Sequence, residues 1–397
     1  MRMNPPEPKP SALGYALLAY MTFVIAAITL IPFEFKLPHE LAFSSGGSLS
    51  DVLENIVLFI PLGFLFHLLR RRTGWRSVLP ALCFGVLVSA ALETGQLFLP
   101  ARYPSLLDVA ANGFGAGLGA AAAAVQHPQV RPEQMSSLFA LEMPLMNVVY
   151  LIIPLLWLGG ISMGGEVHRL GLMLVLGLFG GCVLASVYVS RRPPDRRRGD
   201  PLPAVYASGW FLLGTLPALA SFPLEVLTVA VTVGGAAQIS TRLWKRRNEA
   251  ERRFELTTLH RVLPLYGLFL LLLSLWPSTL PLGEWSRGLD YKHLSEVGRI
   301  VFAARFIEVI AAFTLLGYMV AEMRGRKNES AVKTLSWVAG AALGFSILTA
   351  AVRDFLAGPL SSVLESALFT TAALYGAVIY KFQLAAVQRM QTREPRR

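Results

Sequence analysis

Long apolar runs of about 20 residues recur along the whole chain, separated by short polar stretches. A run of that length, in helical form, crosses the hydrocarbon core of a bilayer. We expect twelve such segments, at about 14–33, 52–69, 76–98, 107–125, 144–162, 168–190, 203–220, 223–241, 262–281, 302–322, 332–352 and 361–381. The pattern therefore predicts an all-α, polytopic integral membrane protein. Composition agrees, since 54% of the residues are hydrophobic and only 15% are charged, against about a quarter charged in soluble domains.

The basic residues predict the orientation of these segments. If the N-terminus is cytoplasmic, 28 of the 36 Lys and Arg residues fall on the cytoplasmic side, seven on the opposite side, and Arg305 within a segment. Cytoplasmic loops carry such an excess, so both termini are predicted to be cytoplasmic. The basic runs 70–72, 196–198 and 245–247 lie beside predicted spans. We therefore expect anionic membrane lipids as partners, and no nucleic acid.

Polar pairs at helical spacing interrupt the apolar pattern in the N-terminal part of the chain. They are Asp51 with Asn55, Glu93 with Gln96, and Asp108 with Asn112. Residues three or four apart share a helix face, and the predicted topology places every pair at the extracytoplasmic end. Ionisable groups at membrane depth are costly and usually functional. The candidate ligand-binding residues are Asp51, Asn55, Glu93, Gln96, Arg102, Asp108 and Asn112.

Three motifs contain these pairs. They read D-x-x-x-N-x-x-x-F-x-P-L-G from Asp51, E-x-x-Q from Glu93, and R-x-x-x-x-x-D-x-x-x-N-x-x-G-x-x-x-G from Arg102. In this order and spacing they resemble the VanZ-like family of bacterial membrane proteins, which is named for a member linked to resistance against a glycopeptide antibiotic. The resemblance covers about residues 14–126. It implies a four-helix unit in the inner membrane of a bacterial cell and a role in the cell envelope.

The C-terminal part of the sequence echoes the N-terminal motifs. E-N-I-V-L-F-I-P-L-G (54–63) aligns with E-V-I-A-A-F-T-L-L-G (308–317), and S-L-L-D-V-A (105–110) aligns with S-V-L-E-S-A (362–367). We predict a VanZ-like four-helix unit at 14–126, a central four-helix unit at 127–260 and a degenerate VanZ-like repeat at 261–385. Residues 1–13 are expected to be a disordered cytoplasmic tail, and 386–397 a basic cytoplasmic tail.

Local spacing suggests partners for the charged residues. Glu93 lies inside the third predicted span, and Arg102 in the following loop is expected to fold back onto it. Arg305 and Glu308 are spaced for an ion pair on one helix face. Arg169 is expected at the membrane interface.

Two interpretations of the polar residues remain open. Asn and Gln side chains join transmembrane helices by hydrogen bonds, and this alone would explain their presence. Alternatively, the seven candidates form an extracytoplasmic pocket that binds a polar, glycan or lipid headgroup, such as that of a lipid-linked envelope precursor. A transporter or flippase for an envelope precursor, and a membrane enzyme acting on an envelope lipid or polymer, are the alternatives. The sequence contains no Ser-His-Asp set, H-E-x-x-H, P-loop or dinucleotide signature, which argues against catalysis. We predict no metal and no cofactor.

Overall fold

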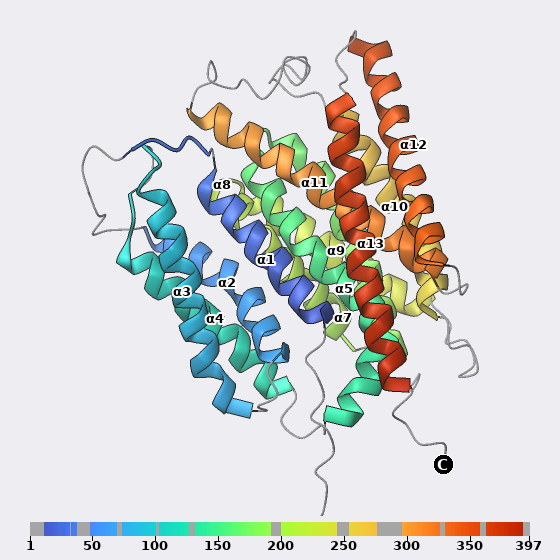
Figure 1. The fold of residues 1–397 in the computed structure, drawn as a ribbon, viewed down its shortest axis with the longest axis horizontal. Helices are drawn as coiled ribbons and strands as arrows, with labels where there is room; N and C mark the ends of the chain where they lie inside the picture. Colours follow the sequence, from blue (N-terminus) through green and yellow to red (C-terminus); the bar gives the residue numbers. More distant parts are fainter. Residues whose placement is uncertain are drawn as a thin grey trace, which may run out of the picture. The chain divides into compact units, whose positions relative to one another are not determined.

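The computed structural model describes the larger part of the chain as helices (Figure 1). The described residues are 12–31, 33–37, 48–69, 74–100, 103–126, 132–191, 200–243, 254–275, 296–325, 330–357 and 363–391. Arg102, one of the seven candidate residues, lies outside them.

Thirteen α-helices follow one another along the described residues. They are α1 (Ala12–Leu30), α2 (Leu49–Leu69), α3 (Val78–Gln96), α4 (Leu106–Gln126), α5 (Pro132–Ile161), α6 (Leu170–Arg191), α7 (Leu202–Gly214), α8 (Leu216–Ser221), α9 (Pro223–Leu243), α10 (Phe254–Leu275), α11 (Glu296–Gly325), α12 (Ala331–Ala357) and α13 (Val363–Gln391). Two short 3-10 turns, η1 (Gly74–Ser77) and η2 (Val167–Arg169), precede α3 and α6. The all-α prediction is confirmed for the described part of the chain.

The seventh predicted segment, 203–220, is two helices instead of one. Pro217 causes the break, because proline has no N–H to donate and its ring clashes with the carbonyl four residues earlier. Thr215 closes α7: its backbone N–H and its hydroxyl both donate to the carbonyl of Phe211, at 2.9 and 2.8 Å. The short helix α8 follows, and Phe222 alone then connects α8 to α9. α7 packs along α9.

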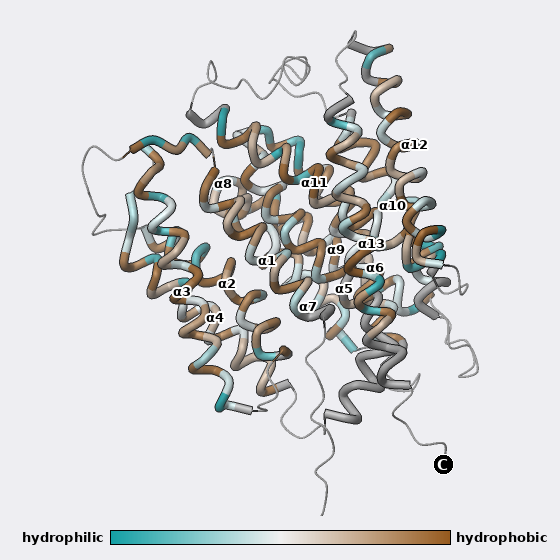
Figure 2. Tube along the Cα trace, viewed as in Figure 1, coloured by the Kyte–Doolittle hydropathy of each residue, from teal (hydrophilic) through white to brown (hydrophobic). Residues whose placement is uncertain are grey.

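Seven stretches of the described residues are long and apolar enough to cross a membrane. They are Leu49–His67, Trp75–Gln96, Leu106–Val125, Val167–Val189, Pro223–Leu243, Arg299–Arg324 and Ala331–Val352. Four shorter apolar stretches are Tyr15–Leu30, Val148–Ile161, Leu202–Gly214 and Thr258–Ser274. Figure 2 shows hydrophobic residues recurring along these helices. The chain is thus a multi-pass helical protein, while the count of twelve spans stays a prediction.

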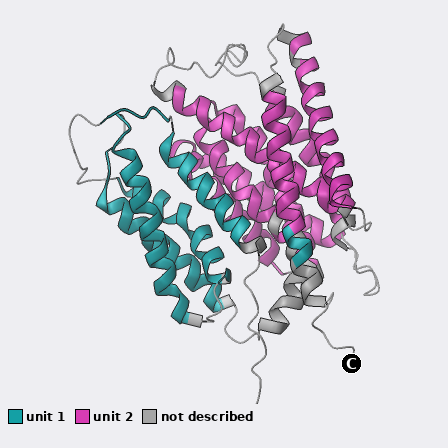
Figure 3. Cartoon of the chain, viewed as in Figure 1, with its two compact units in different colours: residues 1–137, 382–397 teal, residues 138–381 magenta. Residues whose placement is uncertain are grey.

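The chain divides into two compact units (Figure 3). Unit 1 comprises Met1–Ser137 with Phe382–Arg397, and unit 2 comprises Leu138–Lys381. The division into three four-helix sets at 126 and 260 was predicted from sequence similarity, whereas these two units are defined by spatial contacts. The three-set division stays a prediction.

Close helix packing defines the geometry of unit 1. α2 and α4 touch where glycines bring the backbones together: a methyl group on Gly115 would collide with the carbonyl of Ile56, and one on Gly119 with that of Ile60. The contacting residues advance in the same direction along both helices, from Ile56 to Ile60 on α2 and from Gly115 to Gly119 on α4. The two helices therefore run parallel and begin at the same end. α3 packs against α4 in the opposite direction, with Gly85 facing the backbone of 112–113. The C-terminal end of α3 therefore lies where α2 and α4 start.

A crossing of the same geometry occurs within unit 2. In unit 1, a methyl group on Gly63 of α2 would lie 2.5 Å from the carbonyl carbon and 2.6 Å from the Cα of Ala116 on α4. In unit 2, a methyl group on Gly317 of α11 would lie 2.5 and 2.6 Å from the same two atoms of Ala373 on α13.

The second glycine of each crossing matches as well. A methyl group on Gly119 would lie 2.8 Å from the backbone nitrogen of Phe64, and one on Gly376 would lie 2.8 Å from that of Tyr318. Matching these positions shifts α2 onto α11 by 254 residues and α4 onto α13 by 257 residues. These are the shifts of the sequence alignments 54–63 with 308–317 and 105–110 with 362–367.

Candidate functional site

Asp51 caps the start of α2. The backbone N–H of Ser48 donates to Oδ2 of Asp51 at 2.9 Å, and the backbone N–H of Asp51 donates to the Ser48 hydroxyl at 3.2 Å. Such a reciprocal pair satisfies N–H groups that the first helical turn leaves without partners, and the helix dipole favours a carboxylate there. Asp51 is exposed, and Asn55 one turn further is half-buried. Asp51 therefore has a structural role, on a turn that solvent or a ligand can reach.

Glu93 joins the end of α3 to the start of α4. It is buried, and its Oε2 accepts a hydrogen bond from the backbone N–H of Ser105 at 2.9 Å. The Ser105 hydroxyl in turn accepts from the backbone N–H of Asp108 at 3.4 Å. The carboxylate of Glu93 is thus used within the protein to position the turn that begins α4.

Asn112 lies one turn further along α4 and is only 3% exposed. Its Nδ2 donates to the Ser89 hydroxyl on α3 at 2.9 Å. Its Oδ1 is buried without a hydrogen-bond partner among the described residues. An unsatisfied buried acceptor costs about 1–3 kcal/mol, so Asn112 presents a carbonyl oxygen that an N–H or O–H donor would stabilise.

The remaining candidates are placed as follows. Nε2 of Gln96 donates to the carbonyl of Thr29 at 3.2 Å, which links α3 to α1. Because α2 and α4 begin where α3 ends, the six described candidates lie toward one end of unit 1. The predicted Glu93–Arg102 pair falls outside the described residues, and the convergence of all seven side chains stays a prediction.

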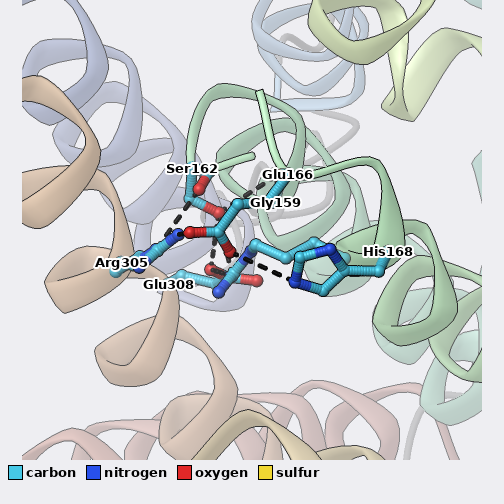
Figure 4. A network of polar contacts seen from close by, with 7 residues as sticks. Gly159, Ser162, Glu166, His168, Arg305 and Glu308 are labelled. Atoms are coloured by element: carbon cyan, nitrogen blue, oxygen red, sulfur yellow. Dashed lines mark hydrogen bonds and ion pairs between the residues drawn. The ribbon is translucent and has the colours of Figure 1, made fainter. Parts of the chain in front are cut away.

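A second polar cluster, which the sequence did not predict, lies in unit 2 (Figure 4). Glu308 of α11 is buried, and its Oε2 accepts a hydrogen bond from Nη2 of Arg169 at 2.8 Å and one from the Ser162 hydroxyl at 2.9 Å. Nη2 of Arg169 also donates to the Ser162 hydroxyl at 3.0 Å. Only 3% of each of the two charged side chains is exposed. Gly159 gives Glu308 room, since a methyl group there would lie 3.4 Å from its Oε1.

Arg305 adds a second ion pair to this cluster. Its Nη2 lies 3.2 Å from Oε1 of Glu166, and its Nε donates to the carbonyl of Ser162 at 3.3 Å. The turn after α5 makes this possible, because Gly164 and Gly165 have φ values of 54° and 91°, which side chains rarely tolerate. The turn brings Glu166 back over α11.

One sequence prediction is corrected here. Arg305 and Glu308 were expected to pair with each other, but each pairs with a residue of the 162–169 turn. The cause is tertiary: a buried charge needs a partner of opposite sign, and this turn supplies Glu166 to Arg305 and Arg169 to Glu308. Arg169, expected at the membrane interface, is buried inside unit 2, and its depth in a membrane stays a prediction.

The cluster is electrically balanced, with two guanidinium and two carboxylate groups. Buried pairs of this kind add little net stability, yet removing one partner costs about 3–5 kcal/mol because the other charge is left buried. Nη1 of Arg305 and Nε of Arg169 are buried without a hydrogen-bond partner within the described part of the chain. The described residues hold no group of three His, Cys, Asp or Glu side chains arranged for a metal ion.

The fold and composition together define a multi-pass α-helical membrane protein. Residues 10–127 match the model of the VanZ/LLP1 family. The N-terminal part of the chain is therefore VanZ-like, and the resemblance drawn from its three motifs is confirmed. No curated protein and no solved structure matches the chain.

Proposed function

We propose that this protein is a VanZ-like component of the bacterial cell envelope that binds a polar, glycan or lipid headgroup at the end of unit 1 where α2 and α4 begin. One observation carries the proposal. Asn112 holds a buried carbonyl oxygen without a partner among the described residues, one turn from the Asp108–Ser105–Glu93 chain of hydrogen bonds. A bound headgroup that donates an N–H or O–H hydrogen bond to this oxygen would offset the free-energy cost of burying it without a partner.

We place this end on the extracytoplasmic side of the inner membrane. The distribution of basic residues supports twelve spans with both termini in the cytoplasm. In that topology α2 and α4 run inward from the outer surface, so their first turns, with Asp51 and Asp108, meet the outer leaflet. The turn after α5 and the first half of α11 fall on the same side.

We also propose that residues 261–385 are a degenerate second copy of the VanZ-like unit. The support is the glycine crossing of α11 and α13, which repeats that of α2 and α4 at the register of the sequence alignment. The polar positions differ: Phe369, at the place of Asn112, stacks on Phe313 with ring centroids 4.5 Å apart. The second copy keeps the scaffold and fills that position with an aromatic ring.

The test is a conservative change of Glu93. Glu93→Gln keeps an oxygen that accepts from the Ser105 N–H and removes the charge. The purified variant, in nanodiscs of bacterial lipid extract, should elute as folded protein yet retain fewer headgroup-bearing molecules than the wild type, as counted by native mass spectrometry. Glu225→Gln, which changes an exposed carboxyl at the start of α9, is the matched control and should behave as wild type.

Four outcomes separate the candidate functions. Glu93→Gln that is folded and retains ligand like the wild type contradicts a charged binding site, and retention that falls only in step with folded protein supports a structural role. Movement of a labelled headgroup lipid between leaflets of proteoliposomes would establish the flippase alternative. A change in the mass of the bound molecule during incubation would establish the enzyme alternative.

A further inference from the structure

The register of the two glycine crossings makes specific residues of the two units equivalent. The shift of 254 residues between α2 and α11 places Glu308 at the position of Glu54 and Arg305 at the position of Asp51. Both pairs lie in the part of the helix that precedes the crossing. The groups that contact Glu308 therefore indicate which kind of chemical group can bind at the position of Glu54.

In unit 2 that position is occupied from within the chain. A guanidinium N–H of Arg169 and the hydroxyl of Ser162 both donate to one oxygen of Glu308, at 2.8 and 2.9 Å. Both donors belong to the 162–169 turn that follows α5, outside the four helices of the proposed second copy. The 162–169 turn thus acts as an internal occupant that presents a cation beside a hydroxyl.

In unit 1 the equivalent position is more open and more negative. Glu54 is half-buried and Asp51 is exposed. The two carboxylates are three residues apart, so they share one face of α2. Where unit 2 has the cation Arg305 at the equivalent position, unit 1 has Asp51, a second acid. Glu93 and Asp108 lie toward the same end, which gives four acidic residues there.

We propose that the headgroup bound by unit 1 carries a primary ammonium group, and that Glu54 together with Asp51 receives it. The inference rests on the function proposed above and adds both the ligand's chemistry and Glu54, which the sequence motifs did not single out as a ligand. Ammonium N–H donors match the two carboxylates as Arg169 matches Glu308. The unpartnered Oδ1 of Asn112 is a further acceptor at this end, and it calls for a donor, as the carboxylates do.

An amine that lacks N–H bonds separates hydrogen bonding from charge. Phosphatidylethanolamine and phosphatidylcholine both carry a positive nitrogen, but only the first can donate. We would purify the full-length protein in nanodiscs of equal parts phosphatidylethanolamine, phosphatidylcholine and phosphatidylglycerol, and compare the lipids that remain bound by native mass spectrometry. The wild type should retain phosphatidylethanolamine over phosphatidylcholine by about tenfold, which corresponds to about 1.4 kcal/mol.

Glu54→Gln should reduce that preference to near the bulk ratio, whereas the Glu225→Gln control should keep it. Soluble ethanolamine phosphate, added as a competitor, distinguishes a soluble amine from a lipid as the natural ligand. Displacement of bound lipid at millimolar competitor indicates the soluble ligand, and resistance to displacement indicates the lipid. Both outcomes support an ammonium ligand if Glu54→Gln abolishes the preference for phosphatidylethanolamine.

Two results would overturn the inference in different ways. If the wild type retains headgroups without preferring the primary amine, the ammonium assignment fails while headgroup binding stands. If the wild type retains no headgroup above bulk, the proposed function fails and this inference fails with it. Should Glu54→Gln not fold, the wild-type preference for phosphatidylethanolamine over phosphatidylcholine still decides, because equal retention contradicts the proposal.

Discussion

A methyl group on Gly63 should force α2 and α4 apart. In Gly63→Ala the new carbon would lie 2.5 Å from the carbonyl carbon of Ala116 and 2.6 Å from its Cα, whereas carbon atoms in contact are about 3.5–4.0 Å apart. Relief requires the helices to separate by at least about 1 Å, because the carbonyl oxygen of Ala116 lies nearer still. That separation forfeits about a quarter to a half of each dispersion contact along the crossing.

The expected cost follows from these distances. Overpacking costs about 1–3 kcal/mol, and the upper end applies because the atoms met are backbone and cannot rotate away. Replacing glycine by alanine within a helix returns up to about 1 kcal/mol. The net loss is then about 2 kcal/mol, or roughly thirtyfold in the ratio of folded to unfolded protein.

The chain offers a control and an equivalent site for this change. Gly117, on α4 of the same unit, has room: a methyl group there would lie 3.5 Å from Leu82 Cδ1, an ordinary contact. In reversible SDS unfolding of the detergent-solubilised protein, Gly117→Ala should be as stable as wild type or more so, and Gly63→Ala less stable by about 2 kcal/mol. Gly317→Ala should lose as much as Gly63→Ala. A Gly63→Ala protein with wild-type stability would refute the crossing, and an unaffected Gly317→Ala would refute its equivalence.

The buried ion pair and the topology give further predictions. Arg169→Met should lower the free energy of unfolding by about 3–5 kcal/mol, because Glu308 keeps its charge without a cation; adding Glu308→Gln should recover part of that loss, and simple additivity in the same unfolding assay would show that the two side chains do not interact. Single cysteines introduced after Leu99, Gly164 and Gly283, in a chain without its two native cysteines, should react with an impermeant thiol reagent added outside. Protection from that reagent at two of the three positions would contradict the topology.

Segment length and hydrophobicity were enough to predict the helices, because an apolar run has few other ways to satisfy its backbone in a membrane. They were not enough to predict the break at Pro217, although Gly214 and that proline were a local signal for one. Nor could they predict the Arg169–Glu308 pair. Its partners are 139 residues apart in sequence, and only the turn through Gly164 and Gly165 brings them together.

The polar residues of unit 1 were identified from sequence, but their partners were not. Helical spacing showed that Glu93 and Asn112 interrupt apolar helices. Which serine each one meets depends on the rotation of α3 against α4, which is set by packing at Gly85. Ser89 and Ser105 gave no signal of their own, since serine is common in transmembrane helices.

Headgroup binding by unit 1, where α2 and α4 begin, is tested most directly by a cryo-electron microscopy map of the protein in nanodiscs of bacterial lipid extract. We expect non-protein density within hydrogen-bond distance of Oδ1 of Asn112, extending toward Glu54. Protein side chains or ordered water filling that space, with the amide fully paired within the protein, would contradict it.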